Sequence, residues 1–191
     1  MQTETTYTCQ ECKETLVRKA CVASTHVLNP APPPPGQRSD QFSIDIVNEI
    51  SRHSVLDQCY SKPCLRGCNL RTRRVWVSTK IVETAPFFIL RINRTCFDVN
   101  TNTPYKNSCT LKAPMELNLV SVMASTCFTK KCVFTLVGSV EHVGQVSTSG
   151  HYTADCRVRD SWWHFDDSTV TPLDNNEPSV CQAVMLMYRR L

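Results

Sequence analysis

The stretch SGHYTADCRVRDSWWHFDDSTV, from Ser149 to Val170, places strand-forming residues on both sides of a polar centre. This pattern predicts an antiparallel β-hairpin whose turn falls within Arg157–Ser161. In the predicted register His151 lies directly opposite Asp166, and side chains alternate between two faces. The apolar face then holds Tyr152, Ala154, Cys156, Val158, Trp163 and Phe165, and the polar face holds His151, Thr153, Asp155, His164 and Asp166.

A histidine beside a carboxylate suits acid–base chemistry. Cross-strand neighbours have Cβ atoms about 5 Å apart, so Asp166 can hold one ring nitrogen of His151. The carboxylate fixes the tautomer, and the imidazole can take a proton from a nucleophile and return it to a leaving group. A histidine–aspartate pair across a hairpin is more commonly a surface hydrogen bond, so spacing alone leaves both interpretations open.

Composition and charge exclude several classes of protein for this chain. The chain has 191 residues, 12 of them cysteine, and a formal net charge of +4. Charged residues throughout the first 20 positions resemble no secretory signal, which favours reduced cysteines in the cytoplasm or nucleus, with metal binding as the competing explanation. The longest apolar runs, such as Ala85–Leu90, are too short to cross a membrane, and no nucleic-acid motif accompanies the basic residues. We therefore expect neither membrane nor nucleic acid as a partner.

The pattern along the chain predicts an α+β protein that is mainly antiparallel β. YTCQECKETLV, starting at Tyr7, reads as two strands around a Cys-x-x-Cys turn, and a proline-rich connector follows at about 30–40. Apolar residues at helical spacing behind Ser39 and Asp40 then predict one short amphipathic helix. From residue 73 onward the remaining segments have strand character.

The chain resembles, over most of residues 7 to 191, the ubiquitin-specific proteases, which are papain-like cysteine deubiquitinases. FTLVGSVEHVGQVSTSGHYTADCRVRDSWWHFDDSTVTPL, closed by AVMLMYRR, is similar to the histidine box of that family: a His-x-Gly turn at 142–144, Gly-His-Tyr at 150–152, a tryptophan, Phe-Asp-Asp and a final strand. APFFILRINR is similar to an upstream strand that ends in Arg94, although Thr95 replaces the usual phenylalanine. KNSCTLKAPMELNL resembles the segment that follows that strand.

The resemblance implies a role for each residue of the hairpin. His151 would be the general base and acid, and Asp166 its orienting partner. Asp167 matches a second acidic position that assists in some members. The alternative for Asp167 is a turn residue at the end of the strand.

The family also carries a zinc ribbon built from two cysteine knuckles. Cys9 and Cys12 resemble the first knuckle, and Cys64 and Cys68 match an irregular second one, with Cys59 as the alternative fourth ligand. Thiolates at spacings of two to four residues suit tetrahedral zinc. Reduced thiols without a metal are the competing interpretation.

The family's nucleophilic cysteine lies in an asparagine- and glycine-containing box, and this sequence has no such box. We therefore expect the chain to be the C-terminal part of the catalytic domain, inactive by itself, with zinc-ribbon fingers at 1–80, a β-rich palm at 81–191 and most of the helical thumb missing. The implied activity is hydrolysis of the isopeptide or peptide bond at the C-terminus of ubiquitin, with ubiquitin or ubiquitinated proteins as partners. The alternatives are a non-catalytic ubiquitin-binding module and a zinc-stabilised β interaction domain.

Overall fold

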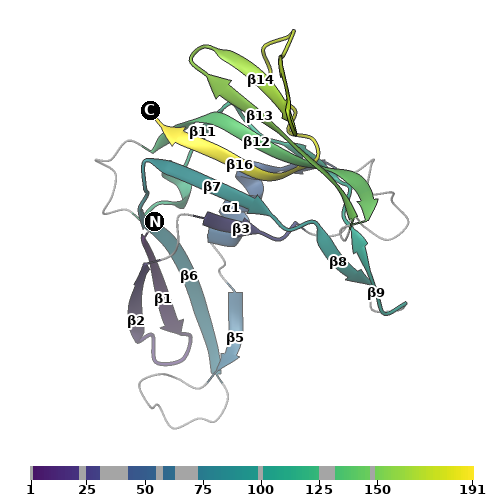
Figure 1. Ribbon diagram of the computed structural model, residues 1–191. Coiled ribbons are helices and arrows are strands. Elements are labelled where there is room, and N and C mark those ends of the chain that lie inside the picture. Colours follow the sequence, from purple (N-terminus) through teal and green to yellow (C-terminus); the bar gives the residue numbers. More distant parts are fainter. Residues whose placement is uncertain are drawn as a thin grey trace.

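The residues that the structure describes form a four-stranded sheet (the smaller sheet), an eight-stranded sheet (the larger sheet), two two-stranded sheets and one α-helix (Figure 1). The computed structural model describes residues 2–21, 25–30, 43–54, 58–62, 73–98, 101–124, 132–146 and 149–191. The predicted proline-rich connector lies outside these residues, apart from Pro30. Within the described ranges, no helix is both long enough and apolar enough to span a membrane.

The smaller sheet is built around the Cys-x-x-Cys turn. Its strands, in spatial order, are β2 (Thr15–Cys21), β1 (Gln2–Cys9), β6 (Arg73–Glu83) and β5 (Gln58–Lys62). The turn between β1 and β2 is closed by backbone bonds from the Cys9 amide to the Glu14 carbonyl and from the Lys13 amide to the Cys9 carbonyl, both 3.0 Å. Lys13 has a φ of 59°, which allows this tight reversal. The predicted strand–turn–strand unit is confirmed.

The larger sheet has eight strands and contains the histidine hairpin. Along the sheet the order is β15 (Thr169–Pro172), β14 (Ser161–Asp166), β13 (Ser149–Val158), β12 (Val133–Val146), β16 (Ala183–Arg190), β7 (Phe87–Ile92) and β3 (Thr25–Leu28), with β11 (Glu116–Asn118) also paired to β12. The β3–β7 pairing is parallel, and the other described pairings of this sheet are antiparallel. The expected α+β class with mainly antiparallel strands is confirmed.

Shorter elements complete the fold. β8 (Thr95–Asp98) and β9 (Thr103–Lys106) form a separate hairpin, β4 (Ser43–Asp45) pairs in parallel with β10 (Thr110–Lys112), and a 3-10 turn, η2, spans Val120–Val122.

The helix α1 (Ile46–Ser54) begins later than predicted. Asp45 caps it, because its Oδ1 accepts the amide protons of Val47 at 2.8 Å and Asn48 at 3.1 Å. The predicted caps Ser39 and Asp40 lie outside the described residues. The helix begins later because residues 43–45 form the strand β4, and Asp45 at the end of that strand takes the capping position.

The core lies between α1 and one face of the larger sheet. Alternate residues of β7 are buried, as in Phe88, Leu90 and Ile92, and from α1 Ile46 and Ile50 pack into the same cluster. Leu28 of β3 belongs to this cluster as well. β3 and α1 therefore pack with the larger sheet, although they precede the expected boundary at residue 80, and β6 crosses that boundary.

Candidate active site

The histidine hairpin is formed by β13 and β14. Val158 pairs with Ser161, so a two-residue turn, with Arg159 at a φ of 57°, joins the strands. Asp155 pairs with His164, which shifts the register by two residues from the prediction. A shift of two keeps every side chain on its predicted face, so the alternation of residues could not distinguish the two registers. The predicted direct opposition is wrong, and His151 and Asp166 are diagonal neighbours.

His151 and Asp166 nevertheless make direct contact. Nε2 of the imidazole lies 2.5 Å from Oδ1 of the carboxylate, and the two side chains are 45% and 47% exposed. Diagonal cross-strand neighbours are within reach of long side chains. Because the carboxylate engages Nε2, Nδ1 is the ring nitrogen left for proton transfer. The contact predicted from the sequence is present, and the catalytic role remains a prediction.

Asp167 lies in a turn, as one of its two sequence interpretations predicted, and its assisting role stays a prediction. It has a φ of 50° in the turn that joins β14 to β15, where Asp166 pairs with Thr169. Its carboxylate also lies in one group with His151 and Asp166, since one possible ligand atom from each falls within 4.8 Å of the others. Among the described residues no other group of three or more histidine, cysteine or acidic side chains converges in this way.

The two carboxylates set the protonation of the imidazole. The hydrogen bond to Asp166 raises the pKa of His151 most, and the charge of Asp166 raises it further. Desolvation opposes this increase, and the charge of Asp167 adds a smaller one. Since the pKa is higher in the folded than in the unfolded state, the contact stabilises the fold while the imidazole is protonated. That stability is lost as the pH rises through the folded-state pKa.

We expect Asp166→Asn to lower the pKa of His151 toward its ordinary value, because the change removes the charge that stabilises the imidazolium. The measurement is an NMR titration of the imidazole protons. Asp160→Asn is the matched control, because Asp160 is 99% exposed at the tip of the hairpin. A His151 pKa that is unchanged by Asp166→Asn would show that the contact does not persist in solution.

A β-bulge positions the backbone immediately before His151. The register of β12 and β13 shifts between Val143 and Val146. The buried ammonium of Lys106 donates to the carbonyls of His142 and Gly144, each at 2.7 Å, which holds the β12 side of the bulge. Burial lowers the pKa of Lys106, and the nearby charge of Arg94 lowers it further, while Glu141 opposes this.

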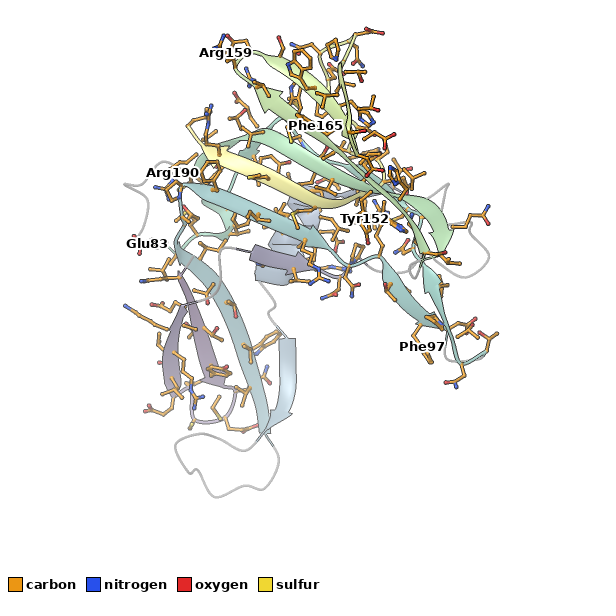
Figure 2. All side chains as sticks on the ribbon, viewed as in Figure 1. Glu83, Phe97, Tyr152, Arg159, Phe165 and Arg190 are labelled. Atoms are coloured by element: carbon orange, nitrogen blue, oxygen red, sulfur yellow. The ribbon has the colours of Figure 1, made fainter. Side chains whose placement is uncertain are left out.

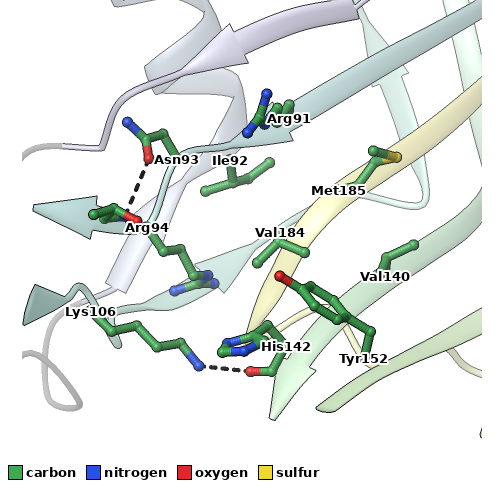
Figure 3. A pocket seen from close by; sticks show the side chains of 11 residues that line it. Arg91, Ile92, Asn93, Arg94, Lys106, Val140, His142, Tyr152, Val184 and Met185 are labelled. Carbon is green, nitrogen blue, oxygen red and sulfur yellow. Dashed lines mark hydrogen bonds between the residues drawn. The ribbon is translucent and has the colours of Figure 1, made fainter. Parts of the chain in front are cut away.

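A pocket of about 360 Å³ adjoins this bulge (Figure 3). Lys106, His142 and Tyr152 are among the residues that line it. The rings of His142 and Tyr152 pack with centroids 4.8 Å apart. Burial lowers the pKa of His142, and the charge of Lys106 contributes. The two histidines thus differ in direction: burial lowers the pKa of His142, which packs against Tyr152, and Asp166 raises the pKa of His151.

Arg94 supports the floor of the pocket from within the protein. It is 4% exposed, and its guanidinium donates to the carbonyls of Asn107, Cys109, Cys181 and Ala183 at 2.8–3.0 Å. These bonds link the start of β8 with the segments before β10 and β16. The family resemblance placed Arg94 at the end of a strand, whereas β7 ends two residues earlier, at Ile92. The network of Arg94 was not predicted, because its acceptors are backbone groups distant in sequence.

A second histidine–aspartate pair lies on the same face of the hairpin. His164 Nδ1 is 2.6 Å from Oδ1 of Asp155, which is 4% exposed, and the Ser179 amide donates to Oδ2 at 2.6 Å. The hydroxyl of Ser139 donates to the Ser179 carbonyl at 2.7 Å. This network ties both hairpin strands to β12 and to the segment before β16. Alternation along the strands predicts that His164 and Asp155 share a face, but it does not indicate that they pair.

Part of the predicted zinc site can be located. Cys9 is buried at the end of β1 and Cys12 is exposed in the turn, while Cys64 and Cys68 lie outside the described residues. For Cys59 only the backbone position on β5, opposite Trp76, is described.

The topology of the smaller sheet bears on the second knuckle. Cys9 and Tyr60 both pair with Val75, from opposite sides of β6, and Lys62 pairs with Arg73. β5 therefore ends, and β6 begins, at the end of the sheet that carries the Cys9–Cys12 turn. The thiol groups of this turn are donors that suit zinc.

An exposed imidazole, held by a carboxylate beside a bulged strand of an antiparallel sheet, defines a candidate acid–base site of the kind used by peptidases with an activated nucleophile. Residues 1–188 match the family described as ubiquitin carboxyl-terminal hydrolase. The chain belongs to this family.

Individual relatives agree with the family match. Ubiquitin carboxyl-terminal hydrolase 24 of Arabidopsis thaliana is 30% identical over 115 residues, which are 60% of this chain and 20% of the relative. Human ubiquitin carboxyl-terminal hydrolase 21 is 28% identical over 148 residues, which are 76% of this chain and 25% of the relative. The matched part thus spans a fifth to a quarter of the length of these relatives.

Solved structures share the fold. One is from the yeast SAGA DUBm with an Sgf73 mutant, with a TM-score of 0.72 and 18% identity over 100% of this chain and 40% of that chain. Another is from the SAGA Ubp8/Sgf11/Sus1/Sgf73 DUB module bound to ubiquitin aldehyde, with a TM-score of 0.71 and 20% identity over 100% of this chain and 41% of that chain. At this identity the likeness shows the fold alone.

Proposed function

We propose that this chain supplies the acid–base half of a thiol-dependent deubiquitinase, which hydrolyses the bond at the C-terminus of ubiquitin. The observation that carries the proposal is the contact between His151 Nε2 and Asp166 Oδ1, which leaves Nδ1 for proton transfer. Membership of the ubiquitin carboxyl-terminal hydrolase family and a shared fold with a DUB module bound to ubiquitin aldehyde support it.

The chemistry follows from the geometry of the pair. Nδ1 of His151 accepts the proton of a cysteine thiol supplied by a segment outside this sequence, and the thiolate attacks the carbonyl carbon of the scissile bond. The imidazolium returns that proton to the lysine amine as the carbon–nitrogen bond breaks, leaving a thioester. His151 then deprotonates a water, which attacks the thioester and releases the ubiquitin carboxylate, and the thiol regains its proton. Asp166 stabilises the imidazolium during both formation and hydrolysis of the thioester, and the carboxylate of Asp167 contributes more weakly.

We propose the smaller sheet as zinc-ribbon fingers and the larger sheet as the palm of this domain. Cys9, Cys12, Cys64 and Cys68 would hold the metal, and its role would be to cross-link the two cysteine turns. The thiols of Cys9 and Cys12 and the connectivity of β5 and β6 support this assignment. The fingers and palm would together bind ubiquitin or ubiquitinated proteins.

The proposal is tested with ubiquitin–aminomethylcoumarin, whose cleavage releases a fluorophore. We expect no turnover by the 191-residue chain, and turnover by a longer gene product that adds a cysteine box upstream, because covalent catalysis requires a thiolate. Substituting the box cysteine by alanine is the matched control and should abolish the signal. Binding of ubiquitin without turnover by the longer protein would contradict the enzyme assignment and favour a ubiquitin-binding module.

A further inference from the structure

A second pocket, of about 480 Å³, lies on the face of the larger sheet opposite the core. Its apolar floor comprises Phe87, Val137 and Met187 from three strands, β7, β12 and β16. Alternation along β16 directs Leu186 and Tyr188, both fully buried, to the core side, and therefore Met187 to the other side. Phe87 is 45% exposed, so the floor is open to a ligand.

Arginines surround this floor. Arg157 is near the end of β13, Arg159 is in the hairpin turn, and Arg189, which pairs with Phe87, is on β16. The side chains of Arg159 and Arg189 make no hydrogen bond or ion pair within the part of the chain that the structure describes. Asp160 is the one acidic residue of the lining, 3.8 Å from Arg157 and 99% exposed. The rim therefore has an excess of positive charge.

The pocket is separate from the candidate active site. Arg157 lies six residues beyond His151 along β13, a separation of about 20 Å for an extended strand. Figure 2 places Arg159 at the tip of the hairpin and Tyr152, beside His151, toward its opposite end. The acid–base chemistry of His151 uses none of these arginines, so the pocket is independent of the proposed function.

We infer that this pocket binds an acidic peptide segment of a partner protein, with one apolar side chain on the floor and flanking carboxylates on the arginine rim. Guanidinium groups bind carboxylates through paired charge-assisted hydrogen bonds, and an apolar anchor in a pocket supplies the contact energy. A nucleic acid fits less well, because its affinity depends on many phosphate contacts and Ile89, the next outward position of β7 after Phe87, is apolar and interrupts the basic surface.

The test is fluorescence anisotropy of the 191-residue chain with two labelled peptides. Both carry flanking aspartates, and they differ only in the central residue, which is leucine in one and glycine in the other. We expect the leucine peptide to bind more tightly, and Arg189→Glu to raise its Kd about tenfold or more, since reversing a rim charge adds repulsion to the lost pairing. Lys112→Glu is the matched control, because it makes the same charge change at an exposed position on β10. It should leave the Kd unchanged.

Other outcomes overturn the inference. Equal weakening by Lys112→Glu would mean that only net charge attracts the peptide. Equal affinity for the leucine and glycine peptides would mean that the floor takes no side chain. Tighter binding of a single-stranded oligonucleotide of equal charge would assign the pocket to nucleic acid. Circular dichroism checks the fold of Arg189→Glu, and Arg159→Glu in the hairpin turn provides a second variant with the same expected weakening.

Discussion

His151→Ala is expected to lower the rate of ubiquitin–aminomethylcoumarin hydrolysis by the longer, cysteine-containing protein by about 10³-fold or more. The variant loses both the base that forms the thiolate and the acid that protonates the leaving group, and each such proton transfer contributes about 10²–10⁴-fold. This expectation rests on the proposed function. The measurement is kcat, with ubiquitin affinity determined in parallel.

The affinity measurement separates catalysis from folding. His151 is exposed and its contact with Asp166 is on the surface, so His151→Ala should leave ubiquitin affinity and the unfolding midpoint close to those of the parent protein. Asp166→Asn should reduce kcat more than Asp167→Asn, because Asp166 makes the direct bond to the imidazole. A fully active His151→Ala protein would make the hairpin pair purely structural.

The pH profile gives a second readout of the pair. As a base His151 acts in its neutral form, so the rate should rise as the pH passes upward through its pKa. Because Asp166 raises that pKa, the residual activity of Asp166→Asn should begin to rise at lower pH than that of the parent enzyme. An ascending limb that does not move would contradict this assignment of the acid–base group.

Gly150→Ala is expected to destabilise the protein by about 2–4 kcal/mol, through backbone strain and overpacking. Gly150 has a φ of 157°, and a Cβ there would overlap His142 Nε2 and lie 2.5 Å from the Val143 carbonyl oxygen. The first is a ring packed against Tyr152 and the second is backbone, so neither can move aside at low cost. The measurement is urea unfolding of the 191-residue chain.

Gly138→Ala is the matched control on the neighbouring strand. A Cβ at Gly138 would meet Asp155, Cys156 and Met187 at 3.7–3.9 Å, which is ordinary van der Waals contact. We therefore expect its unfolding free energy to change by less than about 1 kcal/mol. Equal effects of the two substitutions would indicate that the bulge before His151 relaxes around an added methyl group.

Local sequence was sufficient for features that depend on neighbours along the chain. Alternation assigned the two faces of the histidine hairpin, and the Cys-x-x-Cys spacing predicted the turn between β1 and β2. Alternation also predicted that His151 and Asp166 lie on one face, because a register error of two residues leaves every side chain on its face. Alternation could not set the register itself, which the two-residue turn at Arg159 decides.

The sequence by itself thus determined the class of fold, which side chains share each face of the hairpin, and the histidine and aspartate that meet on one of them, because these depend on residue type and on the two-residue period of a strand. Only the tertiary structure decided that Lys106 holds the bulge before His151, that Arg94 joins three segments, and that Asp155 pairs with His164. The physical reason is that the partners of Lys106 and Arg94 are backbone carbonyls, which every residue carries. No pattern of side chains can therefore indicate which carbonyl a buried cation will reach.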